Sequence, residues 1–348
     1  MLKSVRVKNF GVLPNDEYRF SSGLNVVVGE NGLGKAQLLK LIYAVLKVHV
    51  DSKEYTKTAL QKAYADKLVG VFRPDALGRL VKRRQGQDKC ELVFTMKDGQ
   101  QSCAFSFATR ASVAVQVDET PTTDQHAPAV FLPTRELLTL CPWFGPFYDN
   151  YHVPFEETWR DTVSLLGTPG LKGLKELTVG HLLIPIEAHM GGKVTVDPAT
   201  GEIYLNKPGE SRMEMPLVAE GLRKMAMLAR LISTGILLEK GYLFWDEPES
   251  NLNPKLIKVV AESIMHICNQ GIQVFVATHS LFLLRELEIL AAQSRFESVK
   301  RRYFALKATP DAPEETAVEQ GDSTDDLQTL VLLDEELMQS DRYLAMED

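Results

Sequence analysis

Three glycines and a lysine close to residue 30 have the types and the spacing of a loop that binds phosphate groups. The stretch "GENGLGKAQ" (29–37) places a glycine-rich turn directly before an apolar helical pattern. Glycines leave the backbone unobstructed, so N–H groups at the helix start can surround phosphate oxygens while the lysine adds a positive charge. The predicted cofactor-binding residues of this loop are Gly29, Asn31, Gly32, Gly34, Lys35, Ala36 and Gln37.

Ala36 departs from the pattern, which has Ser or Thr after the lysine. That hydroxyl coordinates Mg²⁺ beside the phosphate oxygens, whereas the loop amides and Lys35 bind phosphate without it. Losing one charge-assisted contact costs about 1–3 kcal/mol. We therefore expect ATP and Mg²⁺ as cofactors, with hydrolysis that is slow or undetectable. A natural alanine and an engineered one give the same sequence, so both origins stay open.

Two adjacent carboxylates follow an apolar run in "YLFWDEPESNLNP" (242–254). A strand at this point delivers Asp246 and Glu247 at its carboxyl end, where ligands bind in open α/β sheets. Asp246 is the predicted metal ligand, which holds Mg²⁺ through water, and Glu247 is the predicted catalytic base, which polarises an attacking water. An ordinary acidic turn is the alternative, and the phosphate loop in the same chain makes it the weaker one.

A histidine follows another apolar run, in "VFVATHS" (274–280). At a strand end, His279 can sense the terminal phosphate of a nucleotide, so we count it with Glu247 among the predicted catalytic residues. A lone histidine is more often structural, but its position after the acidic pair favours a functional role.

The hydrophobic pattern predicts the elements that position these side chains. Continuous apolar runs predict buried strands at 23–30, 242–247 and 272–278. Helical periodicity predicts a helix directly after the glycine loop and a long helix over 220–240. Strand, glycine loop and helix in this order are the context that a phosphate-binding loop requires.

Charge is distributed unevenly along the 348 residues. The formal net charge is −7, yet residues 311–348 contain 13 acidic residues and one arginine, so residues 1–310 carry +5. A mildly basic body permits contact with nucleic acid or an acidic partner, while a solvated acidic terminus is the simpler interpretation of the tail. The four cysteines lack a paired spacing, which argues against a metal site. A reducing cytosol is the simplest location for cysteines of this spacing, so we expect a cytoplasmic protein. No apolar run reaches the roughly 18 residues of a membrane helix, so we expect no membrane partner.

Taken in order, these motifs resemble the ABC-type ATPase heads of the SMC, RecF and OLD group. The stretch "LVAEGLRKMAML" (217–228) lies where that group has its signature motif. The wording "EPESNLNP" is most similar to the AAA-type ATPases of bacterial anti-phage defence systems that lack a coiled coil. The resemblance implies an α/β fold, an ABC-type P-loop ATPase head with a mixed nucleotide-binding sheet in lobe I (1–136 and 240–307). Lobe II (137–239) would be mainly helical and carry the signature helix, and 308–348 would be an acidic segment, partly disordered around 308–323, with a short terminal helix.

The resemblance also implies a head-to-tail homodimer that sandwiches two ATP molecules. Gly221, at the start of the signature helix, would then be a cofactor-binding residue that offers a backbone N–H to the ATP of the opposite head. Arg223 and Lys224 would add positive charge there or face solvent. The sequence has Ala219-Glu220-Gly221 where Ser-Gly-Gly is common, and we expect the Glu220 carboxylate to cap its own helix.

The implied function is that of an ATP-gated dimer, or a higher oligomer, that senses or scaffolds in an anti-phage defence system. It would control a separate effector such as a nuclease, because the sequence has no nuclease motif of its own. A RecF-like DNA repair or recombination ATPase is the alternative, with Lys82, Arg83 and Arg84 as its DNA footprint. A degenerate ATPase that serves only as a scaffold is a third interpretation.

Overall fold

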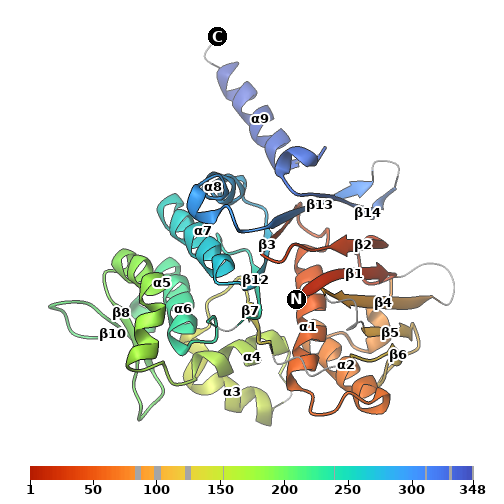
Figure 1. Ribbon diagram of the computed structural model, residues 1–348, viewed down its shortest axis with the longest axis horizontal. Helices are drawn as coiled ribbons and strands as arrows, with labels where there is room; N and C mark the ends of the chain where they lie inside the picture. The colour runs from red at the N-terminus through yellow and green to blue at the C-terminus, as the bar shows by residue number, and fades with distance from the viewer. Residues whose placement is uncertain are drawn as a thin grey trace.

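A mixed six-stranded sheet lies at the centre of the molecule (Figure 1). The computed structural model describes residues 1–82, 88–97, 103–121, 127–151, 153–238, 240–309, 312–328 and 331–346. In spatial order the strands are β14 (Ala312–Gly321), β13 (Arg301–Thr309), β3 (Leu24–Gly29), β12 (Gln273–Thr278), β11 (Tyr242–Asp246) and β7 (Ala129–Leu132). All neighbours pair in parallel except β14, which is antiparallel to β13 at the sheet edge. Every residue of β3 and β12 is buried, as the continuous apolar runs predict.

A second, antiparallel sheet shares a hydrophobic core with one face of the central sheet. Its strands are β2 (Asp16–Arg19), β1 (Leu2–Lys8), β4 (Lys89–Met96), β5 (Cys103–Ala108) and β6 (Gln116–Glu119). Helices α1 (Lys35–Asp51) and α2 (Lys57–Phe72) contribute to the same core. Val27 and Phe244 point into it, whereas their chain neighbours Val26 and Trp245 point into the core on the opposite face. Apolar packing therefore fixes α1, which begins at the glycine loop.

Helices cover the opposite face of the central sheet. A small antiparallel sheet of β10 (Met213–Glu214), β9 (Ile203–Asn206) and β8 (Lys193–Val196) adjoins them. α9 (Val331–Leu344) extends away from the body (Figure 1). None of the described helices has the length and apolar character needed to cross a membrane. The helices that cover this face are α3 (Cys141–Asn150), α4 (Glu157–Leu166), α5 (Leu174–Met190), α6 (Glu220–Thr234), α7 (Pro254–Asn269) and α8 (Leu281–Ala291). Short 3-10 turns occur at Leu77–Leu80, Leu138–Leu140, Met215–Leu217, Ser294–Phe296 and Thr324–Asp326.

The mixed sheet and the mainly helical region confirm the predicted fold class, but two expectations are wrong. Within 308–323, residues 308–309 belong to β13 and residues 312–321 to β14, so these parts extend the central sheet instead of being disordered. Main-chain hydrogen bonds hold β14, and its polar sequence gives no hydrophobic signal of them. The helix expected over 220–240 ends at Thr234, because Gly235 turns into the left-handed region with φ of 80°. The division into lobes stays a prediction.

Candidate nucleotide-binding site

The glycine loop leaves β3 at Gly29 and enters α1. Gly29, Gly32 and Gly34 have φ angles of 148°, 84° and 100°, which residues with side chains rarely adopt. A Cβ atom on Gly29 would lie 2.5 Å from the carbonyl oxygen of Leu306, and one on Gly34 would lie 2.8 Å from Cδ2 of Leu13. Conformation and space therefore both require glycine at these two positions.

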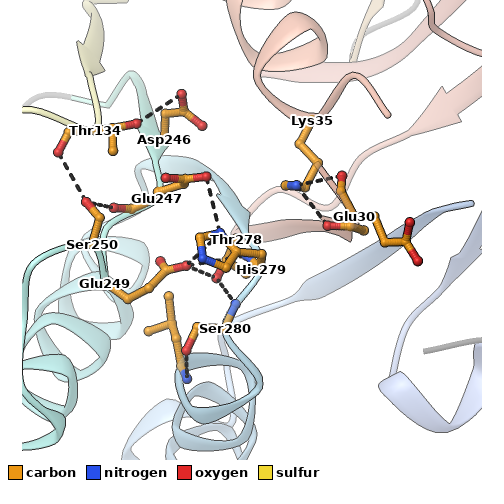
Figure 2. A network of polar contacts seen from close by, with 12 residues as sticks. Glu30, Lys35, Thr134, Asp246, Glu247, Glu249, Ser250, Thr278, His279 and Ser280 are labelled. Atoms are coloured by element: carbon orange, nitrogen blue, oxygen red, sulfur yellow. Dashed lines mark hydrogen bonds and ion pairs between the residues drawn. The ribbon is translucent and has the colours of Figure 1, made fainter. Parts of the chain in front are cut away.

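Lys35 is buried within the loop. Its Nζ donates hydrogen bonds to the carbonyl oxygens of Gly29 at 2.8 Å and Glu30 at 3.0 Å (Figure 2). Burial lowers the pKa of Lys35, and the nearby carboxylates of Glu247 and Asp246 oppose that shift. The loop thus presents a partly desolvated ammonium group close to two carboxylates.

One cavity of about 220 Å³ unites the glycine loop with the acidic pair. Within it, the Gln37 Oε1 accepts a hydrogen bond from the Val12 N–H at 3.2 Å, which ties the start of α1 to the loop after β1. Gly29 contributes the carbonyl oxygen that holds Lys35. Eight predicted site residues line the cavity: Asn31, Gly32, Gly34, Lys35, Ala36, Gln37, Asp246 and Glu247.

Asp246 ends β11, and Glu247 follows it in a left-handed turn with φ of 47°. The Thr134 hydroxyl donates to Asp246 Oδ2 at 3.4 Å. Burial raises the pKa of Asp246 to about 6; Lys40 opposes this shift and Glu247 adds to it. The N–H of Glu247 donates to the Ala277 carbonyl oxygen at 2.9 Å, so the neighbouring strand β12 fixes the turn.

His279 contacts the predicted base: its Nδ1 lies 3.2 Å from Glu247 Oε1 (Figure 2). Glu249, which was not identified from the sequence, positions the histidine through hydrogen bonds to the end of β12. Its Oε1 accepts hydrogen bonds from the Thr278 hydroxyl at 2.6 Å and from the His279 N–H at 3.3 Å. Glu249 is only 6% exposed, and its Oε2 has no hydrogen-bond partner among the described residues. The sequence did contain a signal for this residue, because Glu249 is the third acidic residue of "DEPE" (246–249).

Lys224 is expected from the sequence to contact the ATP of the opposite head or to face solvent, and it does neither, because it is buried within its own chain. It is 2% exposed, within a continuous buried stretch of α6. Its Nζ donates to the Glu247 carbonyl oxygen at 2.6 Å, to the Ser250 hydroxyl at 2.6 Å and to the Ser250 carbonyl oxygen at 3.3 Å. Burial lowers the pKa of Lys224 to about 8. The buried ammonium group therefore ties α6 to the backbone of the predicted base.

The start of α6 packs on the turn that follows β11. Glu220 does not cap its helix, contrary to expectation, because its Oε1 accepts a hydrogen bond from Asn251 Nδ2 at 3.0 Å. Arg223 Nη1 lies 3.4 Å from Oε1 of the buried Glu136, so its charge is also used within the chain. Gly221 does not line the cavity; a Cβ atom there would lie 2.8 Å from the Asn251 carbonyl oxygen.

Comparisons with known proteins agree with this geometry. A family model described as "AAA domain, putative AbiEii toxin, Type IV TA system" matches residues 123–285. The SMC head domain from Thermotoga maritima aligns with a TM-score of 0.50 at 13% identity, covering 91% of this chain and 98% of that one. An SmcHead bound to the C-winged helix domain of ScpA gives 0.57 at 12% identity, covering 92% and 97%. An Smc head domain with an extended coiled coil, bound to the C-terminal domain of ScpA derived from Pyrococcus furiosus, gives 0.53 at 10% identity, covering 98% and 99%.

The chain has the fold of an SMC-type P-loop ATPase head. At these identities the likeness establishes the fold and nothing further. Among curated proteins, none matches the chain in sequence.

The donor set of this SMC-like head fits a nucleotide with Mg²⁺. The loop amides and Lys35 are suited to phosphate oxygens, and Asp246 offers an oxygen ligand whose buried charge a divalent cation would stabilise. The Ala36 side chain offers no oxygen, so the place of a Ser or Thr hydroxyl in the coordination would fall to water. When bound, Mg²⁺ neutralises and orients the phosphate oxygens. Of the predicted DNA footprint, Arg83 and Arg84 lie outside the described residues.

Proposed function

We propose that this SMC-like head binds ATP together with Mg²⁺ and hydrolyses it slowly. The proposal is carried by the one cavity in which the glycine loop and Lys35 meet Asp246 and Glu247. Lys35 and the loop amides would hold the phosphates, and Asp246 would hold the metal ion. Glu247 would accept a proton from an attacking water, and its contact with His279 supports this role. Ala36 removes one metal ligand and so weakens hydrolysis more than binding.

ATP would join two heads in a head-to-tail dimer. Gly221 at the start of α6 lies away from its own cavity, which leaves its backbone for the nucleotide of a second copy. Lys224 connects this helix to the backbone of Glu247. A shift of α6 on association of the heads would therefore change the position of Glu247.

The role that we propose is in a bacterial anti-phage defence system, in the cytoplasm. There, ATP-gated association would control a separate effector such as a nuclease. The match of residues 123–285 to a family whose description names an AbiEii toxin and a type IV toxin–antitoxin system supports this role.

ATP binding is tested by the Lys35→Ala variant. Removing the ammonium group should abolish binding of ATP with Mg²⁺, measured by isothermal titration calorimetry, and ATP-dependent dimerisation with it. Lys255→Ala changes an exposed lysine on α7 and is the matched control, which should bind ATP like the parent chain. Unchanged affinity in Lys35→Ala would show that the glycine loop is not the nucleotide site.

The effect of Ala36 on hydrolysis is tested by Ala36→Ser. The restored hydroxyl should raise the rate of phosphate release by roughly 10- to 100-fold, and only when Glu247 is intact. At about 500 mM salt, the double variant Ala36→Ser/Glu247→Gln should run as a dimer in size-exclusion chromatography when ATP is present and as a monomer when it is absent. Equal rates in the parent and Ala36→Ser, or a monomer with and without ATP, would contradict these two parts. Stimulation by duplex DNA with a steep salt dependence would instead favour the RecF-like alternative.

A further inference from the structure

A basic groove lies where the parallel strands of the central sheet begin, which is the end of the sheet opposite to the glycine loop. It consists of two adjoining cavities, of about 590 and 500 Å³, which share Val299 and Lys300. β3 runs from Leu24 to Gly29, so its amino end borders the groove and its carboxyl end borders the glycine loop. The cationic side chains that line the basic groove are Arg19, Lys97, Lys240, Lys300, Arg301 and Arg302.

Positive charge exceeds negative charge in the basic groove. Among the described residues that line the two cavities, two are carboxylates, Glu297 and Asp322, and six carry cationic side chains. Two of these cations are paired, Arg302 with Asp322 at 2.9 Å and Arg19 with Glu17 at 3.0 Å. In the part of the chain that the structure describes, no carboxylate oxygen lies within 4.0 Å of the ammonium groups of Lys97, Lys240 or Lys300. A concave surface with uncompensated positive charge attracts an acidic partner.

The C-terminal end of the sequence carries the complementary charge. Residues 331–348, here named the acidic arm, contain six carboxylates and one arginine, a net charge of −5. Most of the arm is α9, a helix of 14 residues that extends away from the body (Figure 1). Its Met338, Tyr343 and Leu344 side chains are 56%, 65% and 60% exposed. A helix of this length is marginally stable alone in water, so a surface that covers its apolar side chains would stabilise it.

Contacts just before the acidic arm fix the segment that precedes it. The Asp326 Oδ2 accepts hydrogen bonds from the N–H groups of Asp322 and Ser323, both at 2.9 Å. The Thr324 hydroxyl is hydrogen-bonded to Glu288 of α8. The first two bonds close the 3-10 turn, and the Thr324 contact holds the turn on α8. α9 extends away from the body (Figure 1). No described residue of α9 lines the basic groove of its own copy, so the helix is exposed to another molecule.

We propose that the acidic arm of one copy binds in the basic groove of a second copy. Two copies related by a two-fold axis exchange arms mutually, so the contact closes as a dimer. The groove lies at the amino edge of the sheet, and the contact leaves the glycine loop and Gly221 accessible. It requires no nucleotide, so it stands independently of the proposed ATPase function. Because charge attraction contributes strongly, the association weakens as salt rises.

Sedimentation velocity of the full chain without nucleotide tests the proposal. We expect a dimer at about 50 mM salt that dissociates at about 500 mM. The groove variant Lys300→Glu/Arg301→Glu should raise the dimer dissociation constant by at least about tenfold at low salt. Lys53→Glu/Lys62→Glu makes the same charge change at exposed lysines outside the groove and should dimerise like the parent. A chain that ends after Gln328 should be monomeric.

A charge swap separates a lost contact from a damaged fold. The arm variant Asp334→Lys/Glu335→Lys/Glu336→Lys should be monomeric, and combining it with Lys300→Glu/Arg301→Glu in one chain should restore the dimer. A parent chain that is monomeric at low salt, or a groove variant that dimerises like the parent, would overturn the proposal. DNA binding that is lost only in the groove variant, without any effect on self-association, would assign the groove to nucleic acid instead.

Discussion

Burial raises the pKa of Asp246 to about 6, compared with 3.8 for an ordinary aspartate. Between these pH values the folded chain holds a proton that the unfolded chain has released, so the free energy of unfolding falls as pH rises from about 4 to about 6. The loss amounts to about 3 kcal/mol and persists at neutral pH, where a buried carboxylate is charged. A divalent cation at this oxygen would offset that cost, as expected if Asp246 is the metal ligand that we propose.

Asp246→Asn should therefore stabilise the apo chain while removing the negative charge of the proposed metal ligand. The amide keeps the size of the side chain without its charge, so the free energy of unfolding should rise by up to about 3 kcal/mol at about pH 7.5 and remain unchanged at about pH 4. Urea denaturation at the two pH values measures the difference. Asp75→Asn, at a side chain that is 91% exposed, is the control and should have no effect at either pH. Equal stability of Asp246→Asn and the parent near pH 7.5 would contradict the assignment.

Lys224→Met tests the connection between α6 and the predicted base. Methionine keeps most of the apolar stem but removes the hydrogen bonds to the backbone of Glu247 and to Ser250. In an Ala36→Ser background, kcat should fall by roughly 10- to 100-fold, because the base is no longer held in one position. ATP affinity should stay within about threefold, and Lys255→Met, at an exposed lysine, should leave both unchanged. A parallel loss of ATP affinity would mean that Lys224 supports the fold and does not position Glu247.

Local spacing made part of the site predictable from sequence. Gly29, Gly34 and Lys35 form one local turn, and its positive φ angles favour glycine whatever the rest of the chain does. Glu249 and Lys224 could not be assigned in the same way, because their partners come from other elements that meet only after folding. For Lys224, the sequence contains one indication of burial, which is the position of a lysine on the apolar face of a helix.

At the scale of elements, the edge strand β14 was the main feature that the sequence concealed. Buried strands such as β3 can be predicted from continuous apolar runs. The edge strand β14 gives no such signal, because it is held by main-chain pairing to β13. The paired register runs from Tyr303 opposite Gly321 to Thr309 opposite Ala312. The acidic composition of 311–348 thus covers two different structures, a sheet strand and a projecting helix.

Ending the chain after Thr309 or after Gln328 distinguishes these two structures. The shorter chain loses β14 and exposes the edge of β13, so its melting temperature should drop by at least about 5 °C and it should aggregate. The chain that ends after Gln328 keeps β14 and loses α9, and it should melt like the parent and bind ATP with the same affinity. Differential scanning fluorimetry and isothermal titration calorimetry provide the two measurements. Equal melting temperatures for all three chains would show that β14 adds nothing to the sheet.

At the scale of the whole molecule, the central sheet has two edges with different chemistry. Its carboxyl edge holds the glycine loop, Asp246 and Glu247, whereas its amino edge borders the basic groove. Strand polarity separates the two, since parallel strands all begin at one edge and end at the other. Similarity to SMC heads at 10–13% identity is consistent with this arrangement, because the fold fixes the strand ends more strongly than the residue types on them.

Separate edges predict that two kinds of self-association occur together. In Ala36→Ser/Glu247→Gln with ATP and Mg²⁺ at about 50 mM salt, the head-to-tail contact and the arm contact should both form and produce assemblies larger than a dimer. Raising the salt to about 500 mM, or ending the chain after Gln328, should leave only the ATP-dependent dimer. Omitting ATP, or introducing Lys35→Ala, should leave only the arm-dependent dimer at low salt. Mass photometry measures all of these states. Because the two contacts use opposite ends of the same strand β3, a dimer as the largest species under every condition would mean that they compete, and that at least one of them does not lie at the edge assigned to it.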